Sequence, residues 1–317
     1  MEIRGEGRGI LTGLGLVAAV VVVAASGPSM FPGQPLLQSL RPHLGIALFV
    51  YAVIMVVAGA RWRGLALAAL AALSVGHSAS IIYSQQQARS AVADRPAVAE
   101  FDLLSFNVLN YNEGNSTRIV DTILARDPDV VILMEAAPVF AELPRLREVY
   151  PHGVGCEEER TCDTLLLSKT PLQEGARLTQ LSNFSPRRVI YAASEIGGQR
   201  VNLVAVHMTK PYFDYQSEIE AHTLTQELRR LEGPVVIAGD FNAAPWSGNL
   251  MRLMRNADLI TGNAYPGTWP VELGDFGVPI DTMFTRSPAV ITSIEGLPDP
   301  MGSNHRGIMA RIRLVSP

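Results

Sequence analysis

Hydrophobic residues cluster on two length scales along the chain. Near the N-terminus, three long apolar stretches contain no Asp, Glu, Lys or Arg, and they cover residues 10–26, 44–60 and 64–83. Each is close to the roughly 17–25 residues that a helix needs to cross a bilayer core. Beyond residue 100 the apolar runs are short and bounded by polar and turn residues, as in buried strands. The pattern predicts a membrane region of about three transmembrane helices, residues 1–83, ahead of a globular domain.

The third stretch is the weakest, because His77 and several serines dilute it. We interpret His77 as a polar group that faces neighbouring helices. The first stretch also resembles a signal peptide, since Arg4 and Arg8 precede it and small residues follow. Two further apolar stretches follow at once, so we favour a retained helix.

The loop cations predict the orientation of these helices. Arg4 and Arg8 flank the first helix, and Arg61 and Arg63 form the short link between the second and third. Cations of this kind stay on the cytoplasmic side, so three crossings place everything after the third helix outside the cytoplasm. We therefore expect a multi-pass protein of the cell membrane with an extracytoplasmic domain. If residues 64–83 do not cross, the domain is cytoplasmic instead.

Residues 84–100 are polar, rich in Ala and contain Pro, which predicts a linker, and residues 101–317 form one domain. Apolar positions at helical spacing predict helices over 116–126 and 216–231. The expected strands are 101–109, 129–135, 163–169, 187–196, 201–208, 234–240, 280–286 and 306–315. Many strands and few helices indicate an α/β domain with a two-sheet core covered by helices.

Charge and cysteine content narrow the function further. From residue 97 onward there are 19 Lys and Arg against 27 Asp and Glu, a net charge of −8 with neutral histidine. This balance does not favour a sequence-indifferent nucleic-acid binder, which presents cationic surface to phosphates. The only two cysteines, Cys156 and Cys162, are close enough in sequence to form a disulfide in an oxidising compartment. Two unrelated thiols are the alternative.

Polar side chains stand beside the apolar strands at six places. Each alone has an ordinary explanation as a turn residue or a satisfied histidine. If the strand ends converge, together they make a cluster of carboxylates and imidazoles without cysteine, which suits Mg²⁺ or Mn²⁺. The six residues are Asn107, Glu135, His207, Asp240, Asp281 and His305.

These segments resemble the endonuclease/exonuclease/phosphatase superfamily, which includes pancreatic deoxyribonuclease, inositol polyphosphate 5-phosphatases and neutral sphingomyelinases. In family order the matching segments are LLSFNVLN, VVILME, HMTKP, GDFNAAPWS, PIDTMF and SNHRGI, within about residues 101–315. The resemblance implies a four-layer α/β/β/α sandwich that cleaves phosphoester bonds with a divalent metal. The N-terminal layout is similar to a membrane-anchored bacterial branch associated with teicoplanin resistance.

The resemblance also implies a role for each residue. Glu135 resembles the family's main metal-binding carboxylate, with Asn107 beside it. The residues that resemble the catalytic set are His207, Asp240, Asn242, Asp281 and His305, with Asp281 near the last histidine or at a second metal position. Separately, Arg188, or Arg187 before it, could bind a phosphate oxygen; simple surface charge is the alternative.

One position departs from the family pattern, which usually reads Ser-Asp-His at the last motif. Here Asn304 precedes His305, so the neighbour expected to orient the imidazole carries no charge. Either another carboxylate, with Asp281 as the candidate, supports His305, or activity is weak, or the domain only binds. The other motif residues are present, so we expect catalysis.

Three functions remain open. We favour a membrane-tethered phosphoester hydrolase that acts on lipid-linked phosphates or phospholipid head groups, because the tether holds the site near such substrates. The alternatives are an external nuclease and a non-catalytic module that binds a metal or phosphate, for which Asn304 is the only support. The sequence contains no feature from which a protein partner can be inferred.

Overall fold

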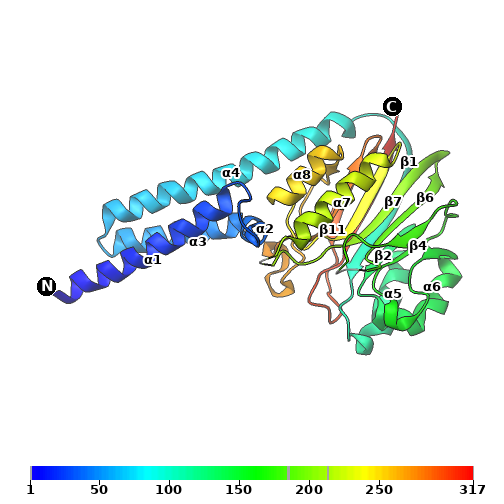
Figure 1. Ribbon diagram of the computed structural model, residues 1–317, viewed down its shortest axis with the longest axis horizontal. Coiled ribbons are helices and arrows are strands. Elements are labelled where there is room, and N and C mark those ends of the chain that lie inside the picture. Colours follow the sequence, from blue (N-terminus) through cyan, green and yellow to red (C-terminus); the bar gives the residue numbers. More distant parts are fainter. Residues whose placement is uncertain (1, 184–185, 213, 317) are drawn as a thin grey trace.

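The computed structural model describes residues 2–183, 186–212 and 214–316, apart from the side chains of residues 2–6. Its N-terminal helices form an arm that extends from a globular domain (Figure 1). The arm consists of α1 (Glu2–Ser26), α2 (Gln34–Ser39), α3 (Arg41–Val57) and α4 (Arg61–Ala93). Two helical segments in this part of the chain, Gly7–Ser26 and Arg61–Ala93, are long and apolar enough to cross a membrane, whereas α3 is shorter.

Apolar side chains cover the outside of the arm. Val20, Val53 and Leu73, one from each long helix, are 68%, 47% and 72% exposed. Contiguous exposed apolar surface of this kind is uncommon on soluble monomers. A buried core helix of a soluble protein therefore does not explain α1 and α4, in each of which only 17% of the most apolar window is buried.

The expected linker over residues 84–100 is mostly helix. Helix α4 continues without a break to Ala93, and β1 starts at Ala97. Gln85 and Gln86 donate hydrogen bonds to the carbonyls of Pro245 and Gly262. The polar composition that predicted a flexible tether thus reflects a helix end that binds the globular domain.

The globular domain contains two six-stranded mixed sheets. The first has the strand order β11-β12-β1-β2-β4-β3, and the second has the order β5-β6-β7-β8-β10-β9. The strands of the first sheet are β1 (Ala97–Asn107), β2 (Val130–Met134), β3 (His152–Val154), β4 (Leu165–Ser168), β11 (Ala289–Gly296) and β12 (Ile308–Val315). Those of the second are β5 (Arg177–Thr179), β6 (Val189–Ile196), β7 (Gln199–His207), β8 (Val235–Asp240), β9 (Ile260–Thr261) and β10 (Asp281–Arg286).

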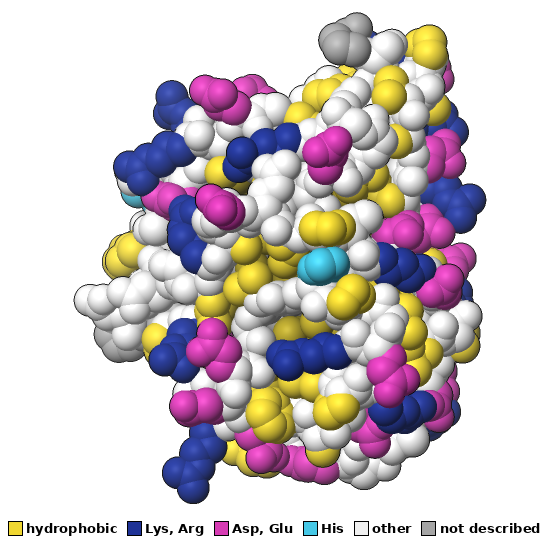
Figure 2. All heavy atoms as spheres, turned by 90° about the vertical axis from the view of Figure 1, so that its right-hand side faces the viewer, with side chains coloured by type: hydrophobic (Ala, Val, Ile, Leu, Met, Phe, Trp, Pro, Cys, Tyr) yellow, Lys and Arg dark blue, Asp and Glu magenta, His cyan; other side chains and the backbone are white. Residues whose placement is uncertain are grey.

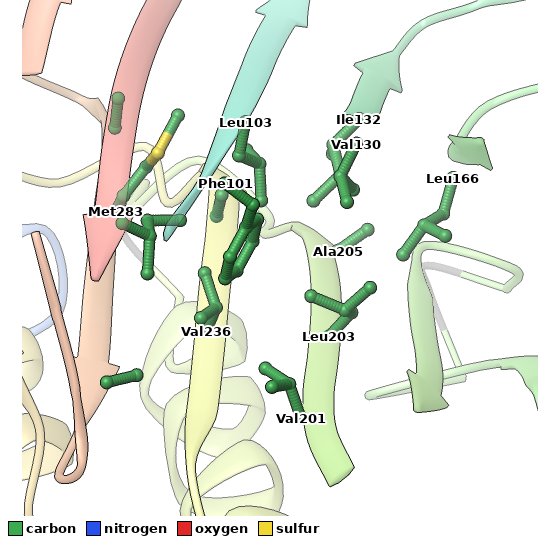
Figure 3. Packing of buried hydrophobic residues seen from close by; sticks show 14 of the residues in the cluster. Phe101, Leu103, Val130, Ile132, Leu166, Val201, Leu203, Ala205, Val236 and Met283 are labelled. Carbon is green, nitrogen blue, oxygen red and sulfur yellow. The ribbon is translucent and has the colours of Figure 1, made fainter. Parts of the chain in front are cut away.

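The main core lies between the two sheets. In Figure 3, Phe101 and Leu103 of β1 face Val236 of β8 and Leu203 of β7, and all four are buried. Alternate residues of β1 point outward, where Leu104 and Phe106 join a second apolar cluster. Burial on both faces explains why these strands read as continuous apolar runs in the sequence.

Helices cover the outer face of each sheet, which completes four layers (Figure 1). Helices α5 (Ser116–Arg126) and α6 (Leu143–Val149) pack on the first sheet through the second cluster. Helices α7 (Gln216–Arg230) and α8 (Gly248–Asn256) pack on the second sheet through a third cluster. The two helices expected from the sequence are confirmed, and α5 begins at Ser116 as expected.

Candidate active site

Strand pairing brings the polar strand ends together. Asn107 pairs with Met134 in the parallel pair β1–β2, so Glu135 follows immediately beyond the same edge. His207 pairs with Asp240 in the parallel pair β7–β8, and Asp281 pairs with Asp240 in the antiparallel pair β8–β10. The carboxyl ends of four strands and the start of β10 therefore meet at one edge of the sandwich.

Asn107 connects the two sheets at this edge. Its Nδ2 atom lies 3.2 Å from Oε1 of Glu135 and 3.1 Å from Oδ2 of Asp240. The other Glu135 oxygen accepts a 2.7 Å hydrogen bond from the backbone N–H of Asn110. Glu135 adopts a left-handed backbone with φ 51°, which is rare for residues other than glycine and aims its side chain at the edge. A carboxylate held in this way is preorganised.

The end of strand β8 depends on a glycine. A Cβ atom on Gly239 would lie 1.8 Å from the carbonyl oxygen of Val206, so only glycine fits between β7 and β8 here. Asp240 follows and accepts a hydrogen bond from the backbone N–H of Asn242 through Oδ1. Asn242 is 7% exposed and donates from Nδ2 to the carbonyl of Met208.

His207 has a carboxylate partner that was not expected from the sequence. Its Nδ1 atom lies 2.9 Å from Oδ2 of Asp163, which stands two residues before β4. Its Nε2 atom faces Glu135 and Asp240, at 4.0 Å from each carboxylate. The Asp–His pair leaves Nε2 as the ring nitrogen that faces the reaction site. One sequence feature could have indicated Asp163 as a site residue, namely its position between a cysteine and an apolar run.

The disulfide anchors the loop that carries Asp163. Cys156 and Cys162 are bonded, as expected, and both sulfurs belong to the apolar cluster behind the first sheet. The carbonyl of Asp163 in turn accepts a hydrogen bond from the backbone N–H of Ala136, next to Glu135. The covalent link therefore restrains a segment that touches two residues of the site.

His305 is oriented by Asp281 rather than by its sequence neighbour. Its Nδ1 atom lies 2.9 Å from Oδ2 of Asp281, whereas the Asn304 side chain is exposed to solvent. Ser303 fixes the turn, because its hydroxyl donates to the carbonyl of Asn107 and accepts from the backbone N–H of His305. The carboxylate that Asn304 lacks is thus supplied from β10.

The carboxylates shift the ionisation of both histidines. Burial would lower the pKa of His305, but the charge of Asp281 and its hydrogen bond raise that pKa to about 9. Burial would likewise lower the pKa of His207, but the hydrogen bond and charge of Asp163 raise it. Burial raises the pKa of Asp240, and the nearby charge of Asp281 raises it further. The site therefore favours the protonated forms of both histidines.

The donor atoms of Asp240, Asp281 and His305 could hold a cation, since one from each lies within 4.8 Å of the others. The Oδ1 atom of Asp281 is buried and has no hydrogen-bond partner within the described chain. From sequence, the metal position was expected at Asn107 and Glu135. These lie next to the cluster, because Asn107 also contacts Asp240. Oxygen-rich donors of this type fit Mg²⁺ or Mn²⁺.

Arginines line a polar pocket of about 370 Å³ beside this cluster. Arg160, Arg187 and Arg188 contribute to its wall together with Asp163, the partner of His207. The Nε atom of Arg188 lies 3.6 Å from Oδ1 of Asp163. The backbone N–H of His207 also donates to the Arg188 carbonyl, which ties this arginine to the site. The pocket suits an anionic group next to the reaction centre.

Comparisons with known proteins agree with this geometry. The pattern of the Endonuclease/Exonuclease/phosphatase family matches residues 104–305. A UPF0294 protein of Vibrio cholerae serotype O1 is 30% identical over 237 residues, which covers 68% of this chain and 79% of the relative.

Solved structures share the fold at low sequence identity. TDP2 from D. rerio in complex with a single-strand DNA product has a TM-score of 0.56 and 17% identity, and covers 67% of this chain and 98% of its own. A beta toxin variant from Staphylococcus aureus with bound magnesium ions has a TM-score of 0.51 and 17% identity, with coverage of 67% and 99%.

Proposed function

Because the chain belongs to the endonuclease/exonuclease/phosphatase family, we propose that it is a membrane-tethered, extracytoplasmic hydrolase of lipid-linked phosphates or phospholipid head groups. The general activity follows from the family: the protein is a phosphoester hydrolase. Tethering, the side of the membrane and the lipid substrate are the parts proposed here. One observation carries the tethering and the lipid substrate, namely that the loop after the site residue Asn242 packs on the N-terminal helical arm.

We assign Mg²⁺ or Mn²⁺ to the carboxylates of Asp240 and Asp281 in this cluster, with Glu135 and Asn107 adjacent. The unpartnered oxygen of buried Asp281 fits this assignment, and magnesium is present in the structurally similar beta toxin. A bound divalent ion would offset the negative charge that grows on the phosphoryl group in the transition state. The beta toxin shares only the fold at its 17% identity, so the assignment rests on the donor set.

The protein's own residues can then be given roles. Asp240 and Asn242 orient water and a phosphoryl oxygen, since both face the edge where the strand ends meet. His207, held by Asp163, presents Nε2 to the site and exchanges a proton there. His305, held by Asp281, stabilises developing negative charge. Arg188 binds a phosphate oxygen at the edge of the polar pocket.

The arrangement of cations supports the proposed orientation. Arg8 bonds the carbonyl of Ala58, and Arg63 bonds the hydroxyl of Thr12. The first helix and the α3–α4 link therefore meet at one end of the arm, opposite the globular domain (Figure 1). With cations on the cytoplasmic side, the catalytic domain lies outside, provided that α1, α3 and α4 all cross. The disulfide fits an oxidising compartment.

Charge does not favour the nuclease alternative. From residue 97 onward the net charge is −8 with neutral histidine, and the face turned away from the arm mixes cationic and anionic side chains (Figure 2). The structural likeness to TDP2 concerns the fold at 17% identity. The non-catalytic alternative depended on Asn304, and Asp281 removes that argument by pairing with His305.

The test uses the full-length protein in lipid nanodiscs with Mg²⁺ or Mn²⁺. Phosphate or head-group release is measured from a phospholipid panel and a polyprenyl diphosphate, with supercoiled plasmid in parallel. We expect the protein to release phosphate or head groups from lipids and to leave the plasmid intact. We expect Glu135→Gln to reduce turnover to the rate measured in buffer alone. Plasmid nicking without lipid turnover would replace the proposal with the nuclease, and inactivity on every substrate would favour a binding module.

A further inference from the structure

A cavity of about 230 Å³ joins the reaction centre to the N-terminal arm. Its lining includes Asn242 and His305 from the candidate active site. The same cavity is lined by Leu36 of α2 and by Leu40, which follows that helix. A ligand with its phosphate at His305 therefore has a direct path to side chains of the arm.

Helix α2 is fixed in place by the loop that carries Asn242. The backbone N–H of Ala244 donates to the Ser39 hydroxyl at 3.0 Å, and Trp246 Nε1 donates to the Ser39 carbonyl at 3.0 Å. The backbone N–H of Gly248 donates to Oε1 of Gln38 at 2.7 Å. Gln38 and Ser39 are both 1% exposed. Helix α2 is thus held rigidly against the catalytic loop and forms a fixed wall of the cavity.

The remaining wall is largely apolar. Trp269, Val278 and Ile280 contribute to it from the segment between β9 and β10. Leu36 and Trp269 retain 41% and 39% exposure, which places apolar surface at the boundary between the cavity and its surroundings. Exposure of such apolar surface to water is unfavourable, whereas the interface of a bilayer accommodates aromatic and aliphatic side chains.

More exposed apolar side chains occur where the arm meets the domain. Phe276 is 82% exposed, and its carbonyl accepts a 2.7 Å hydrogen bond from Nε2 of His43 at the start of α3. Met30, between α1 and α2, is 80% exposed. These residues mark the level at which the apolar helices end and the domain begins, which is where a bilayer surface would lie.

We propose that the cavity is a subsite for hydrocarbon, and that it binds the part of a membrane lipid's chain nearest the scissile phosphate. The inference rests on the proposed function, because it takes the phosphate to lie at Asp240 and His305. The cavity is smaller than the roughly 300–1,000 Å³ of sites that enclose whole ligands. It therefore holds only the first carbons of the chain, while the remainder stays in the bilayer.

The subsite also orients the substrate. The apolar cavity and the arginine-lined pocket both adjoin the candidate active site, but their lining residues differ. A lipid phosphoester has the same two-ended character, with hydrocarbon on one side of the phosphate and a polar group on the other. The chain occupies the cavity beside Leu36, and the polar group occupies the pocket beside Arg188.

The test compares methyl, butyl and octyl p-nitrophenyl phosphodiesters below their micellar concentrations. Water adds to phosphorus, the bond to p-nitrophenolate breaks, and the released p-nitrophenolate is measured by absorbance. Full-length protein is kept in a fluorinated surfactant that competes poorly with hydrocarbon. We expect kcat/KM to rise about fourfold per methylene until the cavity is filled, following the transfer free energy of a buried methylene.

Leu36→Asn is the test variant, and Ile219→Asn is its matched control. Ile219 lies on α7, is 48% exposed and does not line the cavity, so both substitutions change a similarly exposed aliphatic residue. The octyl-to-methyl ratio of kcat/KM is expected to fall at least about tenfold in Leu36→Asn and to stay unchanged in Ile219→Asn. A ratio near one in the wild type, or equal ratios in both variants, would overturn the subsite.

A binding measurement separates failure of the subsite from failure of the proposed function. Methyl and octyl phosphonates, which cannot be hydrolysed, are titrated against the fluorescence of Trp269, with Trp269→Phe to assign the signal. Tighter octyl binding that is lost in Leu36→Asn would support the subsite even if no diester is turned over. Turnover with no preference for octyl in either experiment would leave a phosphoester hydrolase and reject the subsite.

Discussion

The Nδ1 atom of His305 lies 2.9 Å from Oδ2 of Asp281, and this pair joins the last loop of the domain to strand β10. The contact explains how the site tolerates asparagine at position 304. A histidine needs its partner in space rather than in sequence, and β10 delivers the carboxylate through its pairing with β8. Asn304 itself is exposed.

The first prediction therefore contrasts Asp281→Asn with Asn304→Asp. Loss of the carboxylate removes the charge that raises the pKa of His305 and also removes a proposed metal ligand, so we expect kcat to fall at least about 10²-fold. Asn304→Asp should change kcat by less than about threefold, because its side chain points to solvent. Steady-state kinetics on the best substrate measures both. A large gain in Asn304→Asp would show that the exposed position does orient the histidine.

The second prediction concerns Asp163. Replacing it with Asn keeps the shape but removes the charge that holds His207, so we expect kcat to fall about 10²-fold or more with little change in KM. Glu157→Gln is the matched control, because this exposed carboxylate lies inside the disulfide loop that directly precedes Asp163 and is absent from the site contacts described above. Equal losses in the two variants would assign the effect to the loop instead of to the Asp163–His207 pair.

Asp281 and Asp163 differ in whether their roles could be predicted from the sequence. Asp281 was found because it opens an apolar strand within a segment similar to a family motif. Asp163 pairs with His207, which is 44 residues away in the chain, and the contact links the two sheets. No local sequence pattern therefore predicts this pair. Sheet packing creates such pairs, and sequence periodicity reports only which face of a strand is buried.

Helix α2 is a second feature that periodicity could not reveal. Six residues are too few for a helical pattern, and the sequence does not show that the segment GDFNAAPWSG, expected to carry the site residues Asp240 and Asn242, also contacts another helix. In the structure its Asp240 and Asn242 face the site, while Ala244 and Trp246 hold α2. The strands with long apolar runs and the helices with clear stripes were predictable. The short strands β3, β5 and β9 were not predicted, and neither was the longer strand β11.

The third prediction tests the metal assignment. Removal of divalent ions with excess chelator should abolish hydrolysis, and Mg²⁺ or Mn²⁺ should restore it. Binding of Mn²⁺, measured by electron paramagnetic resonance, should weaken at least about tenfold in Asp281→Ala. Asp258→Ala, which removes an exposed carboxylate at the end of α8, should bind as the wild type does. Full activity in chelator would contradict the assignment.

The fourth prediction concerns the disulfide. Opening a loop with a sequence separation of six residues is expected to lower the free energy of unfolding by about 2 kcal/mol. A reductant should therefore lower Tm by about 4–8 °C and reduce turnover, because the same loop positions Asp163. The double variant Cys156→Ser and Cys162→Ser should already have the lower Tm, and the reductant should not change that Tm further. A further fall in that variant would point to an effect of the reductant elsewhere.

The last prediction is that the catalytic domain does not behave as an independent unit. Trp246, Val278 and Ile280 are buried where the domain meets the arm, packed with Leu40 and residues of α4. A fragment of residues 97–317 would expose this apolar surface to water. We expect it to have a lower Tm than the full-length protein and a red-shifted tryptophan emission that Trp246→Phe removes.

Function should respond in the same direction, because the arm supplies one wall of the cavity beside His305. The fragment should lose more activity on octyl than on methyl p-nitrophenyl phosphodiester, whereas a fragment that is merely less stable loses both equally. A fragment with the Tm and the substrate preference of the full-length protein would mean that the arm is only a tether. Unequal loss would instead make the N-terminal arm part of the enzyme's specificity, since hydrogen bonds hold α2 to the catalytic loop.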